Sequence, residues 1–334
     1  MEHVTRQTEQ VYADAITAFR SSQIAHGKTV LCGYYGFGNM GDDALLRAAI
    51  ARTKREAPTQ TISALTKRGR RDGTRFGVRG VRRTSPFAVG RELRGAEHLV
   101  FGGGTLLQER TSLRSLLYYT ALLHYAQSHG VRTELWANGL GEITSTIGQK
   151  RTRAALLGCS HVGLRDAHSL AFARKLLGER TDLSVCAEED LALATPSANA
   201  ERIAFLQKHY GLEGAFAVIA PKGHAPSGTV KFLREWLCVL RAEKVRLLFI
   251  PLYPREDTAL CQRLAAHPND RIATALSPSD LVGLMAQARV VCGMRLHALV
   301  FSSAAGTPFV GFGTDPKIEA FCREHGGILF TDLY

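Results

Sequence analysis

Hydrophobic residues along this chain gather in short runs that alternate with longer segments of helical periodicity. Five runs in the first part read as buried strands, because each is short, apolar and bounded by turn residues: 29–33, 61–65, 98–104, 132–139 and 161–164. Other segments place apolar residues on one helix face, at residues 8–25, 42–53 and 113–130. An aspartate is expected to cap the second of these helices.

The same rhythm restarts after a break at residues 195–200, where Pro, Ser and Asn interrupt the pattern. Further strands are expected at 215–221, 245–252, 289–293 and 308–313, with helices around 229–243, 256–267 and 279–288. Strands that alternate with helices in this way form parallel sheets. The sequence therefore predicts an α/β protein with two domains and a cleft between them, at residues 1–194 and 201–334.

Composition and cysteine pattern narrow the class of protein. The 334 residues are 45% hydrophobic and 22% charged, an ordinary globular composition that excludes a disordered or collagen-like chain. The seven cysteines are scattered and form no CxxC pair, so we expect reduced thiols and no structural zinc. No apolar run reaches the ~20 residues of a membrane span, and the N-terminus lacks a secretory h-region, which predicts a cytoplasmic protein.

The charge is strongly basic and unevenly distributed. The formal net charge is +12, and thirteen Lys and Arg but only four Asp and Glu lie between Arg52 and Glu97. Such a stretch is either a solvated face or a contact surface for an anionic membrane, a small anionic substrate or nucleic acid. It holds only two aromatic residues and no DNA- or RNA-binding motif, so a nucleic acid partner is not expected.

A glycine loop lies between the first strand and the helix after it. Gly36, Gly38 and Gly41 fit the pattern G-x-G-x-x-G, so an NADP-dependent oxidoreductase is an alternative interpretation. The turn is longer than in the usual fingerprint, and the next strand is followed by lysine and arginine rather than by an acid for the ribose. The loop either merely closes a turn or brings Gly38, Asn39 and Asp42 close to a ligand.

Two further strand ends carry candidate chemistry. Three glycines end the strand at 98–104, which lets a ligand approach the backbone at Gly103 and Gly104. In VVCGMRLHALV, Arg295 and His297 fall in the first turn of an expected helix, beside free backbone N–H groups. The arginine fork suits a carboxylate or phosphate, and the histidine can carry a proton. The alternative is a histidine packed in the cleft wall and an arginine that reaches solvent.

Five segments occur in an order and spacing that is itself informative: GYYGFGNMGDDALL, FGGGTLLQE, GLRDAHSL, GMRLHALVFSSAAGTP and DPKIEAF. Together they resemble the polysaccharide pyruvyl transferase family, most closely its CsaB type. The resemblance extends from about Lys28 to about Asp332. Its most specific part is Arg-Leu-His followed about twenty residues later by Asp-Pro-Lys.

The resemblance implies two Rossmann-like domains that face a cleft in a glycosyltransferase-B-like arrangement, with phosphoenolpyruvate as donor and neither a cofactor nor a metal. The product would be a pyruvate ketal on two hydroxyls of a sugar, with release of phosphate. In the CsaB type the acceptor is a lipid-linked precursor of a secondary cell wall polymer that contains N-acetylmannosamine, and the ketal anchors S-layer proteins. The N-terminal domain would bind this glycan and the C-terminal domain the donor, beside the anionic inner face of the membrane.

The resemblance also assigns residues. His297 is the expected general acid that protonates the methylene carbon of the donor, and Arg295 is expected to hold the donor's carboxylate or phosphate. Arg165 and Lys317 match further anion ligands of the family, although by spacing alone each reads as an ordinary surface charge. The general base stays open among Asp42, Asp43 and Glu142. A non-enzymatic alternative is a peripheral protein that binds anionic lipid through residues 52–94.

Overall fold

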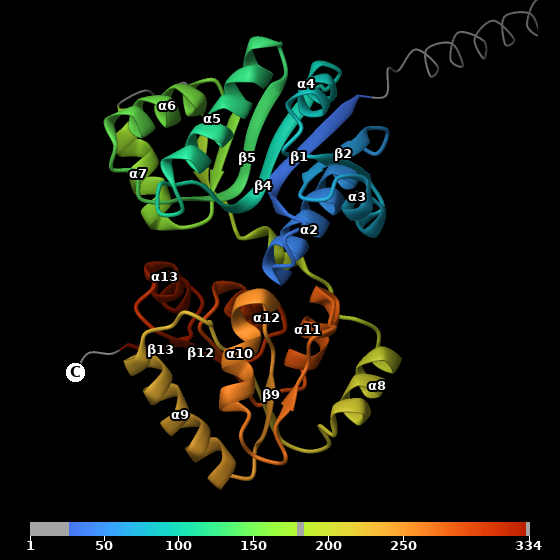
Figure 1. The fold of residues 1–334 in the computed structure, drawn as a ribbon, viewed down its shortest axis with the longest axis vertical. Coiled ribbons are helices and arrows are strands. Elements are labelled where there is room, and N and C mark those ends of the chain that lie inside the picture. The colour runs from blue at the N-terminus through green and yellow to red at the C-terminus, as the bar shows by residue number, and fades with distance from the viewer. Residues whose placement is uncertain (1–26, 179–183, 332–334) are drawn as a thin grey trace, which may run out of the picture.

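The structure, a computed structural model, describes residues 27–178 and 184–331 as two α/β lobes stacked along the long axis (Figure 1). Short apolar strands form the centre of each lobe, and helices cover both faces of each sheet. The expected helix at 8–25 lies outside the described residues. No helix in the two described ranges is both long and apolar enough to cross a bilayer.

The first lobe holds, within the described residues, a parallel sheet of seven strands in the order β3-β2-β1-β4-β5-β6-β7. The strands are β1 (Lys28–Tyr35), β2 (Thr61–Thr66), β3 (Arg79–Arg82), β4 (His98–Leu107), β5 (Arg132–Leu140), β6 (His161–Leu164) and β7 (Val185–Ala187). One face packs against α2 (Met40–Glu56) and α3 (Arg70–Phe76). The other packs against α4 (Pro86–Arg94), α5 (Leu113–Ser128), α6 (Thr146–Leu157) and α7 (Ala167–Leu177).

The second lobe repeats this plan with a parallel sheet in the order β10-β9-β8-β11-β12-β13. The strands are β8 (Phe216–Ala220), β9 (Arg246–Phe249), β10 (Arg271–Ile272), β11 (Val290–Gly293), β12 (Phe309–Phe312) and β13 (Ile328–Phe330). Helices α9 (Ser227–Ala242) and α10 (Pro254–Leu264) cover one face. The other face carries α8 (Ala200–Tyr210), α11 (Pro278–Met285), α12 (Leu296–Ala304) and α13 (Pro316–Glu324).

Both strand orders are those of a Rossmann fold, and the order reverses between β1 and β4 and between β8 and β11. The expected fold class is therefore confirmed. Ligands of such sheets bind at the carboxyl ends of the strands near the reversal, which here are the loops after β1 and β11. The 3-10 helix η1 (Leu191–Ala194) leads from one lobe to the other. The domain division at 1–194 and 201–334 stays a prediction.

One hydrophobic core passes through both lobes. It joins α2 residues such as Leu45 to α12 residues such as Phe301, both fully buried. At the same contact the backbone N–H of Met40 donates to the carbonyl of Leu252, at 2.9 Å. Figure 1 shows the N-terminal end of α2 reaching down to α12. The start of α2 is therefore part of the interface between the lobes.

Some expected boundaries were wrong. Asn39, rather than an aspartate, caps α2, because the helix begins at Met40, two residues earlier than expected. Strand β4 extends three residues beyond the expected end at residue 104, so Thr105 lies inside it, and Ser112 caps α5. Strands β3, β7, β10 and β13 were missed. They are two to four residues long and lie at or next to sheet edges, so their sequences carry little of the apolar signal of a buried strand.

Candidate active site

His297 lies where the two lobes touch. It is in the first turn of α12, and its ring packs so closely on Gly41 of α2 that a Cβ at that position would overlap it. The ring Nε2 is enclosed and has no hydrogen-bond partner among the described residues. Burial lowers the pKa of His297 to about 4; Asp190 opposes this effect, while Arg165 and Lys317 add to it. The side chain is therefore neutral at pH 7.

Two cations, one from each lobe, converge beside this histidine. Arg165 follows β6, and Lys317 is in the first turn of α13; both donate to the hydroxyl of Thr105, at 3.0 Å each. Arg165 also donates to Asp190 at 3.0 Å, and only 6% of its side chain is exposed. Burial, with Arg165 nearby, lowers the pKa of Lys317 to about 8. Two positive charges thus meet at one neutral oxygen, an arrangement that favours a bound anion.

The glycines after β4 aim Thr105 at these cations. Gly103 and Gly104 both have φ of +81°, a backbone conformation that other residues rarely adopt. A Cβ on Gly103 would press on Leu45, so this glycine serves close packing. A Cβ on Gly104 would lie 3.8 Å from a carboxyl oxygen of Asp42. Of the two expected ligand-facing glycines, Gly104 is thus the one that faces the candidate site.

The three candidate bases have different surroundings. Asp42 is only 8% exposed, and burial, together with Asp43 and Asp190, raises its pKa to about 8 against the opposing effect of Arg165. Asp43 forms an ion pair with Arg75 at 2.8 Å. Glu142 is exposed on the wall of a neighbouring cavity. Only Asp42 of the three is close to Arg165 and Asp190.

Arg295 lies beside the site, but carboxylates of its own lobe occupy its fork. As the N-cap residue of α12 it donates from Nε to Asp257 at 3.1 Å and from Nη2 to Glu256 at 2.8 Å. Asp257 is fully buried, so the pair fixes the side chain in place. The role of Arg295 as a donor ligand stays a prediction.

In the glycine loop after β1, Asn39 and Gly41 have structural roles, whereas Gly38 is open to solvent. The Asn39 side chain accepts from the N–H of Gly41 at 3.1 Å and so caps α2. Gly41 accommodates the His297 ring. Gly38 is exposed, with φ of +83° and no atom near its missing Cβ, so it alone is open to a ligand. Contacts of Gly38 and Asn39 with a substrate stay predictions.

Three cavities follow the interface between the lobes. The first, of about 330 Å³, is lined by Arg165, Asp190, Leu296 and Lys317 among others. The second, of about 420 Å³, shares Lys317 with the first, and the third, of about 230 Å³, shares Arg110 and Asp315 with the second. The third also contains two residues that sequence reasoning missed, Lys222 and His224. Their place after β8, at the strand-order reversal, is the signal that could have found them.

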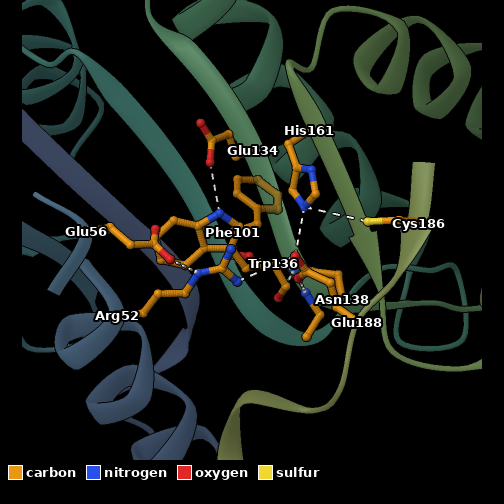
Figure 2. Close-up of polar contacts among 10 residues, drawn as sticks. Arg52, Glu56, Phe101, Glu134, Trp136, Asn138, His161, Cys186 and Glu188 are labelled. Carbon is orange, nitrogen blue, oxygen red and sulfur yellow. Dashed lines mark hydrogen bonds and ion pairs between the residues drawn. The ribbon is translucent and has the colours of Figure 1, made fainter. Parts of the chain in front are cut away.

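A cluster with metal-ligand side chains lies elsewhere in the first lobe. The potential ligand atoms of His161, Cys186 and Glu188 are within 4.8 Å of one another (Figure 2). Glu188 already accepts from the N–H of Ala137 at 2.8 Å and contacts His161 at 2.8 Å, and the guanidinium of Arg52 lies 3.5 Å away. These partners satisfy the carboxylate without a metal ion, so we read the cluster as a polar network that joins β5, β6, β7 and α2. The sequence missed it because the residues come from separate strands.

Comparisons with known proteins agree with this architecture. The profile of the family "Polysaccharide pyruvyl transferase" matches residues 39–316, and no curated protein matches the chain. Anabaena HepE, solved with UDP-glucose, has a TM-score of 0.56 at 15% identity over 92% of this chain and 86% of its own. UDP-GlcNAc 2-epimerase from Methanocaldococcus jannaschii has a TM-score of 0.57 at 11% identity, over 91% of this chain and 88% of its own. A family 9 glycosyl transferase from Veillonella parvula has a TM-score of 0.51 at 11% identity, over 93% of this chain and 89% of its own. These likenesses show a glycosyltransferase-B-like fold.

Proposed function

The chain belongs to the polysaccharide pyruvyl transferase family, and from this premise we propose that it transfers pyruvate from phosphoenolpyruvate to a sugar of a cell-surface polysaccharide precursor. Family membership supports pyruvate transfer to a polysaccharide. The donor has the chemistry that the site requires, because it carries both a carboxylate and a phosphate. The pyruvate would bridge two hydroxyls of the sugar as a ketal, and inorganic phosphate would leave.

One observation supports this proposal most strongly: Arg165 and Lys317, from different lobes, both donate to Thr105. Arg165 is also paired with Asp190, but among the described residues the Lys317 ammonium has only this neutral hydroxyl as a hydrogen-bond acceptor. Charge-assisted bonds to an anion are roughly twice as strong, so the site favours an anion beside Lys317. Oxygens of the donor would replace Thr105 on the two cations. The lowered pKa of Lys317 agrees with this, because a cation held in a site without its anion loses its proton more easily.

The second cavity has the properties of a sugar site. It adjoins Lys317 and is lined by the polar residues Glu142 and His168 and by the aromatic side chain of Phe172. Sugars need hydrogen-bonding groups around their hydroxyls and an apolar surface for their C–H faces. We propose that the acceptor binds here and that, as in the CsaB type, it is a lipid-linked unit that contains N-acetylmannosamine.

The test is phosphate release from phosphoenolpyruvate, with a panel of tagged β-glycosides of N-acetylmannosamine, galactose and glucose as acceptors. We expect release that depends on one of the sugars, and a product whose mass corresponds to that sugar with a pyruvate ketal. The Lys317→Met variant is the matched control for a contaminating phosphatase. Absence of acceptor-dependent release across the panel, together with binding of NADPH, would favour the oxidoreductase alternative instead.

A further inference from the structure

The first turn of α2 contains a buried carboxyl group without a partner. Asp42 is the third residue of this helix, and only 8% of it is exposed. Its carboxyl oxygens make no hydrogen bond and no ion pair with residues 27–178 or 184–331. Of the two acids in this turn, Asp43 and not Asp42 has an enclosed carboxyl oxygen without a partner, so the Asp42 carboxyl still reaches solvent and is open to a substrate.

The titratable groups that face Asp42 come from several elements around it. They are Tyr34 and Tyr35 on β1, Asp43 on α2, Arg165 after β6 and Asp190 before η1. Burial is the largest effect, and the two neighbouring acids add to it. Both effects favour the protonated carboxyl, and Arg165 does not outweigh them, so the pKa of Asp42 rises to about 8.

His297 is the counterpart of Asp42. Its ring rests on Gly41, the residue before Asp42, and its buried Nε2 has no partner among the described residues. Arg165 and Asp190 influence both side chains, but the pKa of His297 falls to about 4. An acid that keeps its proton and a base that lacks one are therefore held at the same end of α2, the pattern by which environments separate acid and base roles.

We propose that Asp42 is a catalytic residue that gives its proton to the methylene carbon of phosphoenolpyruvate, while His297 accepts the proton of the attacking sugar hydroxyl. This inference rests on the proposed function. The sequence predicts His297 as the general acid, and this proposal makes it the general base instead. The proposal also makes Asp42 a general acid, whereas the sequence left Asp42, Asp43 and Glu142 as candidates for the general base.

The proton balance of the reaction closes over one turnover. Asp42 transfers a proton to the methylene carbon, which makes a methyl group and leaves an oxocarbenium-like C2. The first sugar hydroxyl forms a C–O bond to C2 and gives its proton to His297, for which the ring must become accessible, because its Nε2 is enclosed in this structure. The bond between C2 and the phosphate oxygen then breaks, and His297 returns its proton to the leaving phosphate. The second hydroxyl closes the ketal on C2 and re-protonates Asp42.

The experiment compares wild type, Asp42→Asn and the matched control Asp43→Asn. Each is assayed for folding, for calorimetric binding of phosphoenolpyruvate and for turnover with the acceptor found above. We expect Asp42→Asn to bind the donor but to lose at least about 100-fold in kcat, as is typical for loss of a proton donor. At pH 6, Asp43→Asn should stay within a few-fold of wild type, because Asp43 is paired with Arg75. Its kcat should fall at lower pH than that of wild type, because Asp43 helps to raise the pKa of Asp42.

Two further measurements test the role of Asp42 without relying on the loss of turnover in Asp42→Asn. At saturating donor, wild-type kcat should fall as pH rises above about 8, where Asp42 loses its proton. The profile is taken on kcat because Lys317, which titrates in the same range, acts on donor affinity. Infrared difference spectra should show a protonated carboxyl at pH 7 that Asp42→Asn lacks, and this measurement holds even if that variant binds no donor.

The outcomes are distinguishable. An active wild type whose Asp42→Asn variant turns over within a few-fold overturns the role of Asp42 and leaves the proposed function intact. An ionised Asp42 at pH 7 in the infrared spectra overturns it as well. A wild type that releases no phosphate from the donor with any acceptor removes the proposed function itself, and the inference with it.

Discussion

The molecule carries positive charge in two regions that differ in their surroundings. Between the lobes, Arg165 and Lys317 are partly buried and share one hydroxyl as a hydrogen-bond acceptor. On the outer face of the first lobe, Arg70, Arg82 and Arg91 are exposed around a hollow of about 480 Å³. In the sequence both groups are simply positive charges. Burial strengthens the attraction between the first group and an anion in direct contact, which makes this group selective for a bound anion.

The outer basic region differs from the buried pair in the range and strength of its attraction for anions. Exposed charges are screened beyond about 10 Å at ordinary salt, so they attract a charged surface without fixing one ligand. Phe87, at the start of α4, is 92% exposed on the same lobe, and aromatic residues of this kind enter lipid headgroups readily. We propose that this region holds the protein reversibly at an anionic membrane beside a lipid-linked acceptor. In this proposal the buried cations between the lobes bind the donor, and the exposed basic region binds the membrane.

The largest expected effect comes from His297→Ala. Because a positioned proton-transfer group contributes about 10²–10⁴-fold, we expect turnover to fall by that factor while donor binding persists. Steady-state phosphate release and calorimetry measure the two quantities. The control is His209→Ala, which changes an exposed histidine of α8. Near-normal turnover in the His297→Ala variant would show that His297, and the interface around it, take no part in catalysis.

Lys317→Met should mainly weaken donor binding. Hydrogen bonds to charged groups contribute about 1.5–3 kcal/mol, so the affinity for phosphoenolpyruvate should fall about 10- to 100-fold. In wild type the affinity should also fall as pH rises through about 8, because Lys317 then loses the charge that attracts the donor. The variant should lack this pH dependence, while Lys208→Met, at an exposed lysine, should retain it. Equal affinities of wild type and Lys317→Met would contradict the cation pair.

Stability provides a second view of the same lysine. The pKa of Lys317 is lower in the folded protein than its ordinary value of 10.5. The unfolded chain therefore binds more protons between about pH 8 and 10.5, and this residue makes the folded state more stable as pH rises across that window. Denaturant unfolding of wild type and Lys317→Met at several pH values should show the difference. An identical pH dependence would mean that Lys317 is not desolvated.

Arg295→Lys should act on stability more than on binding. A lysine cannot reproduce the fork on Asp257 and Glu256, so we expect the free energy of unfolding to fall by about 1–3 kcal/mol. Arg289→Lys, at an exposed arginine just before β11, should leave stability unchanged. Urea unfolding and donor calorimetry distinguish the two roles. Unchanged stability with lost donor affinity would show that Arg295 binds the donor, as the family resemblance implied.

The smallest effect on turnover should come from charge reversal on the outer face. Replacing Arg70, Arg82 and Arg91 with Glu should abolish sedimentation with anionic liposomes, at about 1 kcal/mol for each lost charge, and leave activity on a soluble acceptor unchanged. Reversing the exposed residues Lys150, Arg151 and Arg153 of α6 changes the net charge equally and should preserve sedimentation. Failure of wild type to sediment with anionic liposomes even at low salt would make the basic region a solvated face.

Much of the fold follows from hydrophobic patterning. Buried central strands such as β1, β4 and β8 are continuous apolar runs, and their order in the sequence predicts parallel sheets. Edge strands such as β3 and β13 lack this signal, because they are short and bury fewer of their side chains. Start positions of helices were less predictable. The start of α2 depends on Asn39 and on a tertiary contact with Leu252, and the second of these is invisible in the sequence.

The candidate site was predictable in its charged residues but not in their arrangement. Arg165 and Lys317 came from the family resemblance and His297 from its place at an expected helix start, and the structure brings the three together at the interface. The role of Thr105 was missed because its position depends on two left-handed glycines inside β4. The pairing of Arg295 with Asp257 was missed as well, since 38 residues separate them in the sequence.

The most direct test of the account is a crystal structure of the protein with phosphoenolpyruvate. We expect the carboxylate and phosphate oxygens within hydrogen-bonding distance of Arg165 and Lys317, both released from Thr105, and the methylene carbon facing Asp42. Donor bound only in the outer basic hollow, or beside Lys222 and His224 with both Thr105 contacts intact, would contradict the claim that the buried cations between the lobes form the donor site.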